Sequence, residues 1–197
     1  MKKILLTIII SLFTFINTSK AEESYIFGGA KLFNYGLETS DLQALNTSLV
    51  NLGFSSSTST TDNSGIGFDF GVGLNLSDNF AIEVGYVDYG TLEINTTLTG
   101  PSETLKTEIN GNGITGAGVL KFGDAQDNFY IKGGMHRWEF EGTVTASLGS
   151  STEPLGTGTD LMIGAGYNSG NWFASYDYYY IEDGDISSIG IGYKKPF

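Results

Sequence analysis

The sequence predicts an all-β fold: an eight-stranded antiparallel barrel that crosses a membrane. Three observations lead to this fold class. Along eight segments, apolar residues alternate with small or polar ones at a period of two, the pattern of a strand with two unlike faces. Long and short connections alternate between these segments up to the last connection, which is short. The 28 Gly, 13 Phe and 11 Tyr suit strands better than helices. Strands can cross lipid only in a closed barrel, where no backbone group stays unpaired.

The amino terminus has the pattern of a cleavable signal peptide. Two lysines precede a largely apolar run of thirteen residues, Ile4–Ile16, and small residues lead up to Ala21. A membrane anchor helix is the alternative, but such a helix needs roughly 20 apolar residues. We therefore expect export and cleavage after Ala21. Residues 1–21 would form the signal peptide and residues 22–197 a single barrel domain.

Charge and composition exclude several kinds of partner and chemistry. Cleavage would leave seven Lys and Arg against 22 Asp and Glu, a net charge of −15. This argues against a nucleic-acid partner, because proteins bind its phosphates with clustered Lys and Arg. The chain has no Cys, which rules out disulfides, thiolate metal sites and Cys nucleophiles. We expect no cofactor and no metal site.

Eight segments are expected to cross the membrane. Ile66–Leu76 shows the alternation most clearly, with apolar residues on one face and Gly, Asp and Asn on the other. Its eleven residues are about what a tilted strand needs to cross a bilayer. We expect the apolar face to contact lipid and the other face to line the lumen. A soluble lipocalin-like barrel is the alternative fold. The predicted strands are Tyr25–Tyr35, Ile66–Leu76, Phe80–Leu92, Ile109–Phe122, Phe129–Phe140, Asp160–Tyr167, Trp172–Ile181 and Ile186–Phe197.

Three short turns are expected on one rim of the barrel. They fall at residues 77–79, 127–128 and 169–171, and an aromatic residue follows each of them directly. Amphipathic aromatic rings are favoured where a membrane meets water. We therefore expect these aromatic residues, with the one at the carboxyl terminus, to form a girdle at the periplasmic interface. The predicted girdle consists of Phe80, Phe129, Trp172 and Phe197.

The connections on the opposite side are long and polar. They are predicted as extracellular loops at Gly36–Ser64, Leu92–Glu108 and Gly142–Thr159. The first contains a Ser- and Thr-rich run, Ser55–Thr61, and a segment with regularly spaced Leu, Asp41–Gly53. That segment is either a brief helix or a disordered tip. Short turns on one side and long loops on the other are typical of outer-membrane barrels.

Several segments resemble the transmembrane domain of OmpA-like outer-membrane proteins. Phe80–Gly90, Phe129–Trp138 and Leu161–Phe197 carry the resemblance and occur in the family's order. It implies a barrel in the outer membrane of a Gram-negative bacterium, in contact with outer-membrane lipids and lipopolysaccharide and inserted by the barrel assembly machinery. Family members often carry a peptidoglycan-binding domain, which is not expected here. The family's closing signal usually has an aromatic residue third from the end, where this chain has Lys195.

Four charged residues are predicted to face the lumen. Aligning the segments beyond the short turns places Glu83 and Lys132 at one height, where they could meet. Asp69 and Asp177 are further inward-facing acids. The interior of an eight-stranded barrel is just wide enough for side chains to fill. A charge network would therefore plug the lumen, or would act as a gate that passes small ions when a pair breaks.

Motifs that would indicate catalysis are weak. Gly111–Gly116 matches the dinucleotide pattern GxGxxG, but a further strand follows it instead of the required helix. His136 is the only histidine, and no GxSxG nucleophile motif occurs. We expect His136 to be packed at the rim. The expected function is a structural or cell-surface interaction role without catalysis, with an extracellular ligand of the loops as a candidate partner. The alternatives are a narrow porin-like channel and, less favoured, a lipid-modifying barrel enzyme.

Overall fold

The computed structural model describes residues 24–197 except 52, 54–55, 100–101, 125 and 182–183. The predicted signal peptide lies outside the described residues. Within them, one helix and nine strands follow one another, and no helix is long and apolar enough to span a membrane. The elements are β1 (Tyr25–Asn34), α2 (Thr39–Asn51), β2 (Ser56–Asp62), β3 (Ser64–Ser77), β4 (Phe80–Thr99), β5 (Glu103–Gly123), β6 (Asp127–Ala146), β7 (Gly149–Ser169), β8 (Trp172–Tyr179) and β9 (Ile186–Pro196).

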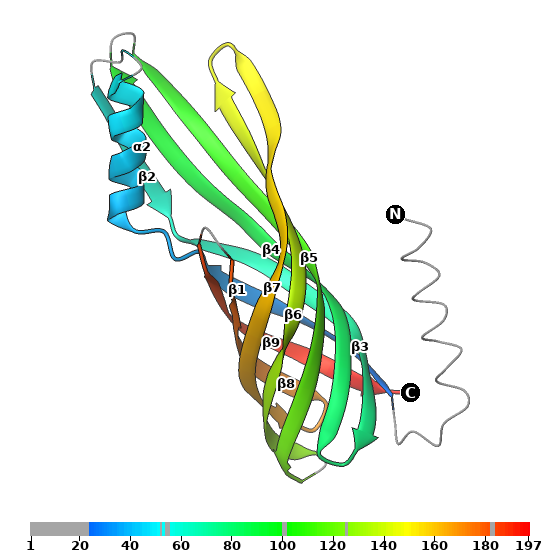
Figure 1. The fold of residues 1–197 in the computed structure, drawn as a ribbon. Coiled ribbons are helices and arrows are strands. Elements are labelled where there is room, and N and C mark those ends of the chain that lie inside the picture. The colour runs from blue at the N-terminus through cyan, green and yellow to red at the C-terminus, as the bar shows by residue number, and fades with distance from the viewer. Residues whose placement is uncertain (1–23, 52, 54–55, 100–101, 125, 182–183) are drawn as a thin grey trace.

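Eight of the strands close into a ring. Each pairs antiparallel with its neighbours in the order β1, β3, β4, β5, β6, β7, β8 and β9. The ring closes where β9 pairs with β1, for example at Ala30 and Ile191. Figure 1 shows the resulting barrel, with the carboxyl terminus beside the start of β1. The predicted fold class is confirmed.

Outward and inward residues alternate along the strands of the ring. In β3, Phe68 and Phe70 point outward and are 45% and 53% exposed, whereas Asp69 between them is 8% exposed. In β9, Ile189 and Ile191 are each 65% exposed, and Ser188 is buried. An apolar exterior around a small and polar interior is the distribution of a barrel whose wall contacts lipid.

The side predicted to be extracellular differs from the expectation of long polar loops. Most of Leu92–Glu108 and of Gly142–Thr159 is strand, because β4 with β5 and β6 with β7 continue as paired hairpins beyond the barrel. The Ser- and Thr-rich run forms most of β2, which pairs with β4. Thr and other β-branched residues favour strands when a partner strand is available. We call the described residues of 92–109 and 142–157, with β2 and α2, the extracellular extension (Figure 1).

The segment expected as a helix or a disordered tip is the helix α2. Near its start, the Glu38 N–H donates to Asp41 Oδ2 at 2.8 Å, and an acidic residue is favourable in a first helical turn. Along the helix, Asn46 Oδ1 accepts hydrogen bonds from the hydroxyls of Ser57 and Ser59 at 2.8 and 2.9 Å. These bonds hold α2 against β2.

A β-bulge in β4 joins the barrel to the extension. The pairing of β4 with β5 shifts between Asp88 and Gly90. Gly90 has a φ of 78°, which glycine adopts easily, and its N–H donates to Asp88 Oδ1 at 2.7 Å. Before the bulge odd-numbered residues such as Val87 are buried, and after it even-numbered ones such as Leu92 and Ile94 are buried. The bulge thus continues the apolar inner face into the extension.

Candidate functional site

The periplasmic half of the lumen is filled by aromatic rings that lie on glycines. Tyr25, Tyr130 and Phe173 point inward and are at most 6% exposed. Each faces a glycine directly across the strand pairing, and a Cβ on that glycine would overlap the ring. The inward glycines therefore make room for large side chains. The pairs are Tyr25 with Gly73, Tyr130 with Gly166 and Phe173 with Gly192.

The centre of the lumen holds a network of buried ion pairs. Lys31 Nζ contacts Asp177 Oδ2 directly and lies 3.0 Å from Asp69 Oδ2. Lys132 Nζ lies 2.8 Å from the other carboxylate oxygen of Asp177. The side chains of Lys31 and Asp177 are 1% and 0% exposed. The network thereby connects β1, β3, β6 and β8 across the barrel.

A second ion pair lies nearer the periplasmic turns. Glu83, the fourth residue of β4, has its Oε1 3.1 Å from Lys194 Nζ and accepts a hydrogen bond from the Tyr25 hydroxyl at 2.7 Å. Lys194 Nζ also lies 4.9 Å from the centre of the Tyr130 ring, a cation–π distance. The direct contact expected between Glu83 and Lys132 is not formed, because Lys132 reaches Asp177 instead.

The charges of this network are balanced. Each of the three lysines lies within ion-pair distance of at least one of the three acids. Removing one partner of a buried pair typically costs about 3–5 kcal/mol, because the other charge is left uncompensated. The network therefore favours one arrangement of the strands around it. Its members are Lys31, Lys132, Lys194, Asp69, Glu83 and Asp177.

The extracellular half of the lumen is closed by an aromatic cluster around His136. His136 is fully buried. Its Nε2 lies 2.9 Å from the backbone oxygen of Tyr180, and its Nδ1 lies 2.7 Å from the Tyr89 hydroxyl. A carbonyl can only accept, so Nε2 carries the proton and Nδ1 accepts from Tyr89. Both nitrogens are engaged and the ring packs on Tyr179, an arrangement unsuited to a general base.

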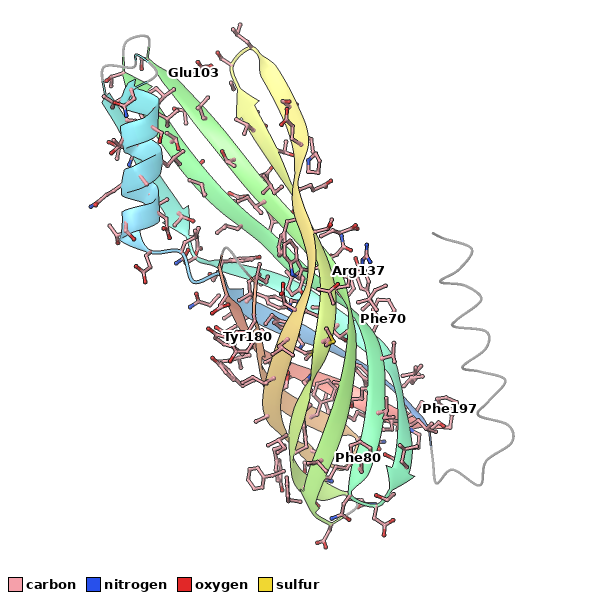
Figure 2. All side chains as sticks on the ribbon, viewed as in Figure 1. Phe70, Phe80, Glu103, Arg137, Tyr180 and Phe197 are labelled. Atoms are coloured by element: carbon pink, nitrogen blue, oxygen red, sulfur yellow. The ribbon has the colours of Figure 1, made fainter. Side chains whose placement is uncertain are left out.

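The four predicted girdle residues lie near the barrel end opposite the extension. Phe129, Trp172 and Phe197 are 67%, 63% and 57% exposed, and Phe80 is half-buried. Figure 2 shows Phe80 and Phe197 on the barrel, far from Glu103 at the tip of the extension. Trp172 packs edge-on against the Tyr193 ring, with 5.4 Å between their centres. Their role at a membrane interface stays a prediction.

Two residues of the lumen network were missed by sequence reasoning. Lys31 and Lys194 each supply an ion-pair partner to the predicted acids. A signal was present, since each lysine lies on the inward face of its strand: Lys194 follows Gly190 and Gly192 there, and Lys31 lies between Gly29 and Phe33. The GxGxxG match lies within β5, a continuous strand paired on both sides, so the helix that phosphate binding requires is not there.

A closed barrel with an apolar exterior and a filled interior defines a small transmembrane β-barrel. The chain belongs to the family described as the outer membrane protein beta-barrel domain, whose model matches residues 19–194. It is therefore an outer-membrane protein of a Gram-negative bacterium, which confirms the resemblance and sets aside the soluble alternative. A search of the curated proteins finds no match.

Solved structures of bacterial outer-membrane proteins share this fold. OprG from Pseudomonas aeruginosa is 12% identical with a TM-score of 0.53, and the match covers 89% of this chain and 97% of OprG. Ail, the attachment invasion locus protein of Yersinia pestis, is 16% identical with a TM-score of 0.50, covering 89% and 99%. Ail in complex with the heparin analogue sucrose octasulfate matches at 14% identity and a TM-score of 0.50, covering 88% and 98%. At these identities the likeness shows the fold alone.

Proposed function

We propose that this protein is a closed barrel that anchors the extracellular extension for interaction at the cell surface. The observation that carries the proposal is the packing of the lumen at three successive levels. These levels are the rings on glycines, the ion-pair network and the aromatic cluster around His136. A barrel interior of this size, filled by side chains, suits an anchor better than a pore.

The extension supplies the interaction surface. It carries β4 to β7 well beyond the ends of β1, β8 and β9 (Figure 1). Its acids outnumber its bases, with Asp41, Asp62, Glu93, Glu103, Glu108 and Glu153 against Lys106. A negative surface disfavours sulfated sugars such as the heparin analogue seen with Ail, and favours neutral or positively charged partners. We also expect contact with lipopolysaccharide and insertion by the barrel assembly machinery.

Adhesion of cells that display the protein tests this function. A trimmed variant in which short turns replace residues 93–108 and 142–156 keeps the ring of eight strands and loses both hairpins of the extension, including the part of β4 that pairs with β2. We expect cells with the full chain to adhere to immobilised extracellular-matrix proteins or glycans, and cells with the trimmed variant to lose that adhesion. Heat-modifiable migration on gels would show that the trimmed barrel still folds. Equal adhesion of the two variants would contradict the proposal.

A narrow channel is the second candidate. The observation that favours it is the polar strip of the lumen, where the buried Ser175 hydroxyl has no hydrogen-bond partner among the described residues. Water could satisfy such groups if the network opened. A lipid-modifying enzyme is a weaker candidate, because both nitrogens of His136 are already bonded within the lumen.

A further inference from the structure

A hollow of about 360 Å³ opens on the outer surface of the barrel wall, where β4 to β7 leave the barrel. It faces outward. Tyr86 and Asp88 flank the buried Val87 in β4, so they lie on the opposite, outer face of the strand, and Glu139 lies on the same face of β6 as the exposed Met135. It is therefore separate from the filled lumen. Its polar and aromatic lining includes Tyr86, Asp88, Asn110, Asn112, Glu139 and Glu141.

Strand register places this hollow at the outer edge of the apolar belt. Val84, Gly116, Met135 and Leu161 form one outward row across β4 to β7, and it is apolar. The next row toward the extension contains Tyr86, Ile114, Arg137 and Thr159, and the row after it contains Asp88, Asn112, Glu139 and Thr157. Figure 2 shows Arg137 pointing away from the barrel, farther toward the extension than Phe70. The hollow thus lies where lipid gives way to the sugar layer of the outer leaflet.

Two β-bulges shape the hollow. The first is the register shift between Asp88 and Gly90 in β4. The second lies between Phe140 and Glu141, which pair with Gly156 and Pro154 and leave Leu155 as the extra residue of β7. Five of these residues line the hollow, namely Asp88, Gly90, Phe140, Glu141 and Pro154. Bulges bend a sheet and are frequent beside functional sites. Two of them around one concavity indicate that the backbone itself forms it.

The side chains around the hollow match the chemistry of a sugar. Asp88, Glu139 and Glu141 are acceptors for sugar hydroxyls, and the amides of Asn110 and Asn112 can both donate and accept. Tyr86 provides an aromatic wall on the membrane side, and the Phe70 ring supports it with 5.4 Å between the ring centres. The volume falls within the roughly 300–1,000 Å³ of small-molecule sites.

We propose that this hollow binds a saccharide without phosphate or sulfate substituents. Three carboxylates would repel an anionic sugar, and no basic side chain lines the hollow to offset them. A metal-bridged phosphate is disfavoured as well, because the described residues include no group of three or more His, Asp or Glu that could hold a metal ion. The proposal names a class of ligand for the proposed role at the cell surface. It rests on that role and does not depend on whether the lumen is closed.

Binding of core oligosaccharide to the full-length protein in nanodiscs tests the proposal. The probe is the core oligosaccharide released from rough lipopolysaccharide and dephosphorylated, with the phosphorylated form for comparison. We expect the dephosphorylated form to bind at least tenfold more tightly in isothermal titration. Glu139→Gln and Asn112→Ala should each weaken that binding about tenfold. Intact rough lipopolysaccharide in the nanodisc should compete with the soluble probe if the sugar is supplied by the membrane, and should leave its binding unchanged if the source is external.

Glu153→Gln is the matched control, because it removes an exposed acid of the same extension outside the hollow. It should bind the probe as the wild type does, and heat-modifiable migration should show that all three variants fold. Absence of binding at millimolar concentration, equal binding by Glu139→Gln and wild type, or tighter binding of the phosphorylated form would each overturn the proposal. None of these outcomes decides the adhesion test. Adhesion can depend on surfaces of the extension that lie outside the hollow, and the trimmed variant removes those surfaces.

Discussion

Lys31 and Asp177, 146 residues apart in the chain, form a buried ion pair at the centre of the barrel. Lys31 comes from the first strand of the ring and Asp177 from the last but one. These strands are brought near each other by the closure of the ring, so the contact depends on that closure. Asp177 holds Lys132 on its other oxygen at 2.8 Å. Two lysines from distant parts of the sequence therefore share one carboxylate.

Asp177→Ala should strongly destabilise the barrel. The substitution leaves Lys132 without an ion-pair partner and Lys31 with Asp69 alone. We expect the free energy of unfolding to fall by about 3–5 kcal/mol. Urea unfolding in detergent, followed by tryptophan fluorescence, measures it. Glu93→Ala is the control, since its pair with Lys106 is largely exposed and should matter much less. Similar losses in both variants would contradict the assigned role of the buried network.

Gly73→Val should be destabilising where Gly116→Val is tolerated. A Cβ at Gly73 would overlap the Tyr25 ring, whereas nothing lies within 4 Å of a Cβ at Gly116 on the lipid-facing side. Overpacking of this kind costs about 1–3 kcal/mol. The temperature at which each variant loses its heat-modifiable gel mobility gives the comparison. If both variants behave alike, the inward glycines are not there to accommodate rings.

The contact between Glu103 and Ser147 should depend on pH. Two hydrogen bonds from Ser147, at 2.7 Å from the hydroxyl and 3.0 Å from the N–H, lower the pKa of the Glu103 carboxyl below its ordinary value of 4.5. A lowered pKa in the folded state means that the contact contributes stability above pH 4.5 and loses it as the pH falls through the folded pKa. The NMR shift of the Ser147 amide should titrate in that acidic range, and Glu103→Gln should abolish the titration. A shift that is independent of pH would contradict this.

Period-two alternation predicted the ring because burial on two unlike faces leaves that pattern directly in the sequence. Ile66–Leu76 is a clear example, and it lies within β3. The same pattern predicted that the strands end near Leu92 and Gly142, where the residues become polar. Beyond those points the outward face is rich in Thr and acids, and polarity alone resembles a loop. Strand pairing, which continues the hairpins, is a property of two segments and is not visible in either of them.

Four residues of the lumen network could be predicted from the sequence, but which of them form ion pairs with each other could not. Alternation along each strand places Glu83, Lys132, Asp69 and Asp177 inward. Their ion-pair partners depend on how far neighbouring strands are shifted along each other. Counting residues from the short turns does not give this shift. Lys132 and Asp177 are joined through Gly164 of β7, which pairs with both of them. A glycine there leaves the space that the Lys132 and Asp177 side chains use.

Single-channel recording in planar bilayers tests the closed lumen most directly. The wild-type protein should give little or no conductance, because side chains fill the lumen at three levels. Glu83→Ala, which removes the ion-pair partner of Lys194 and the acceptor of the Tyr25 hydroxyl, should conduct measurably more. Steady conductance of the wild type, unchanged by Glu83→Ala, would contradict a closed barrel and favour the narrow channel.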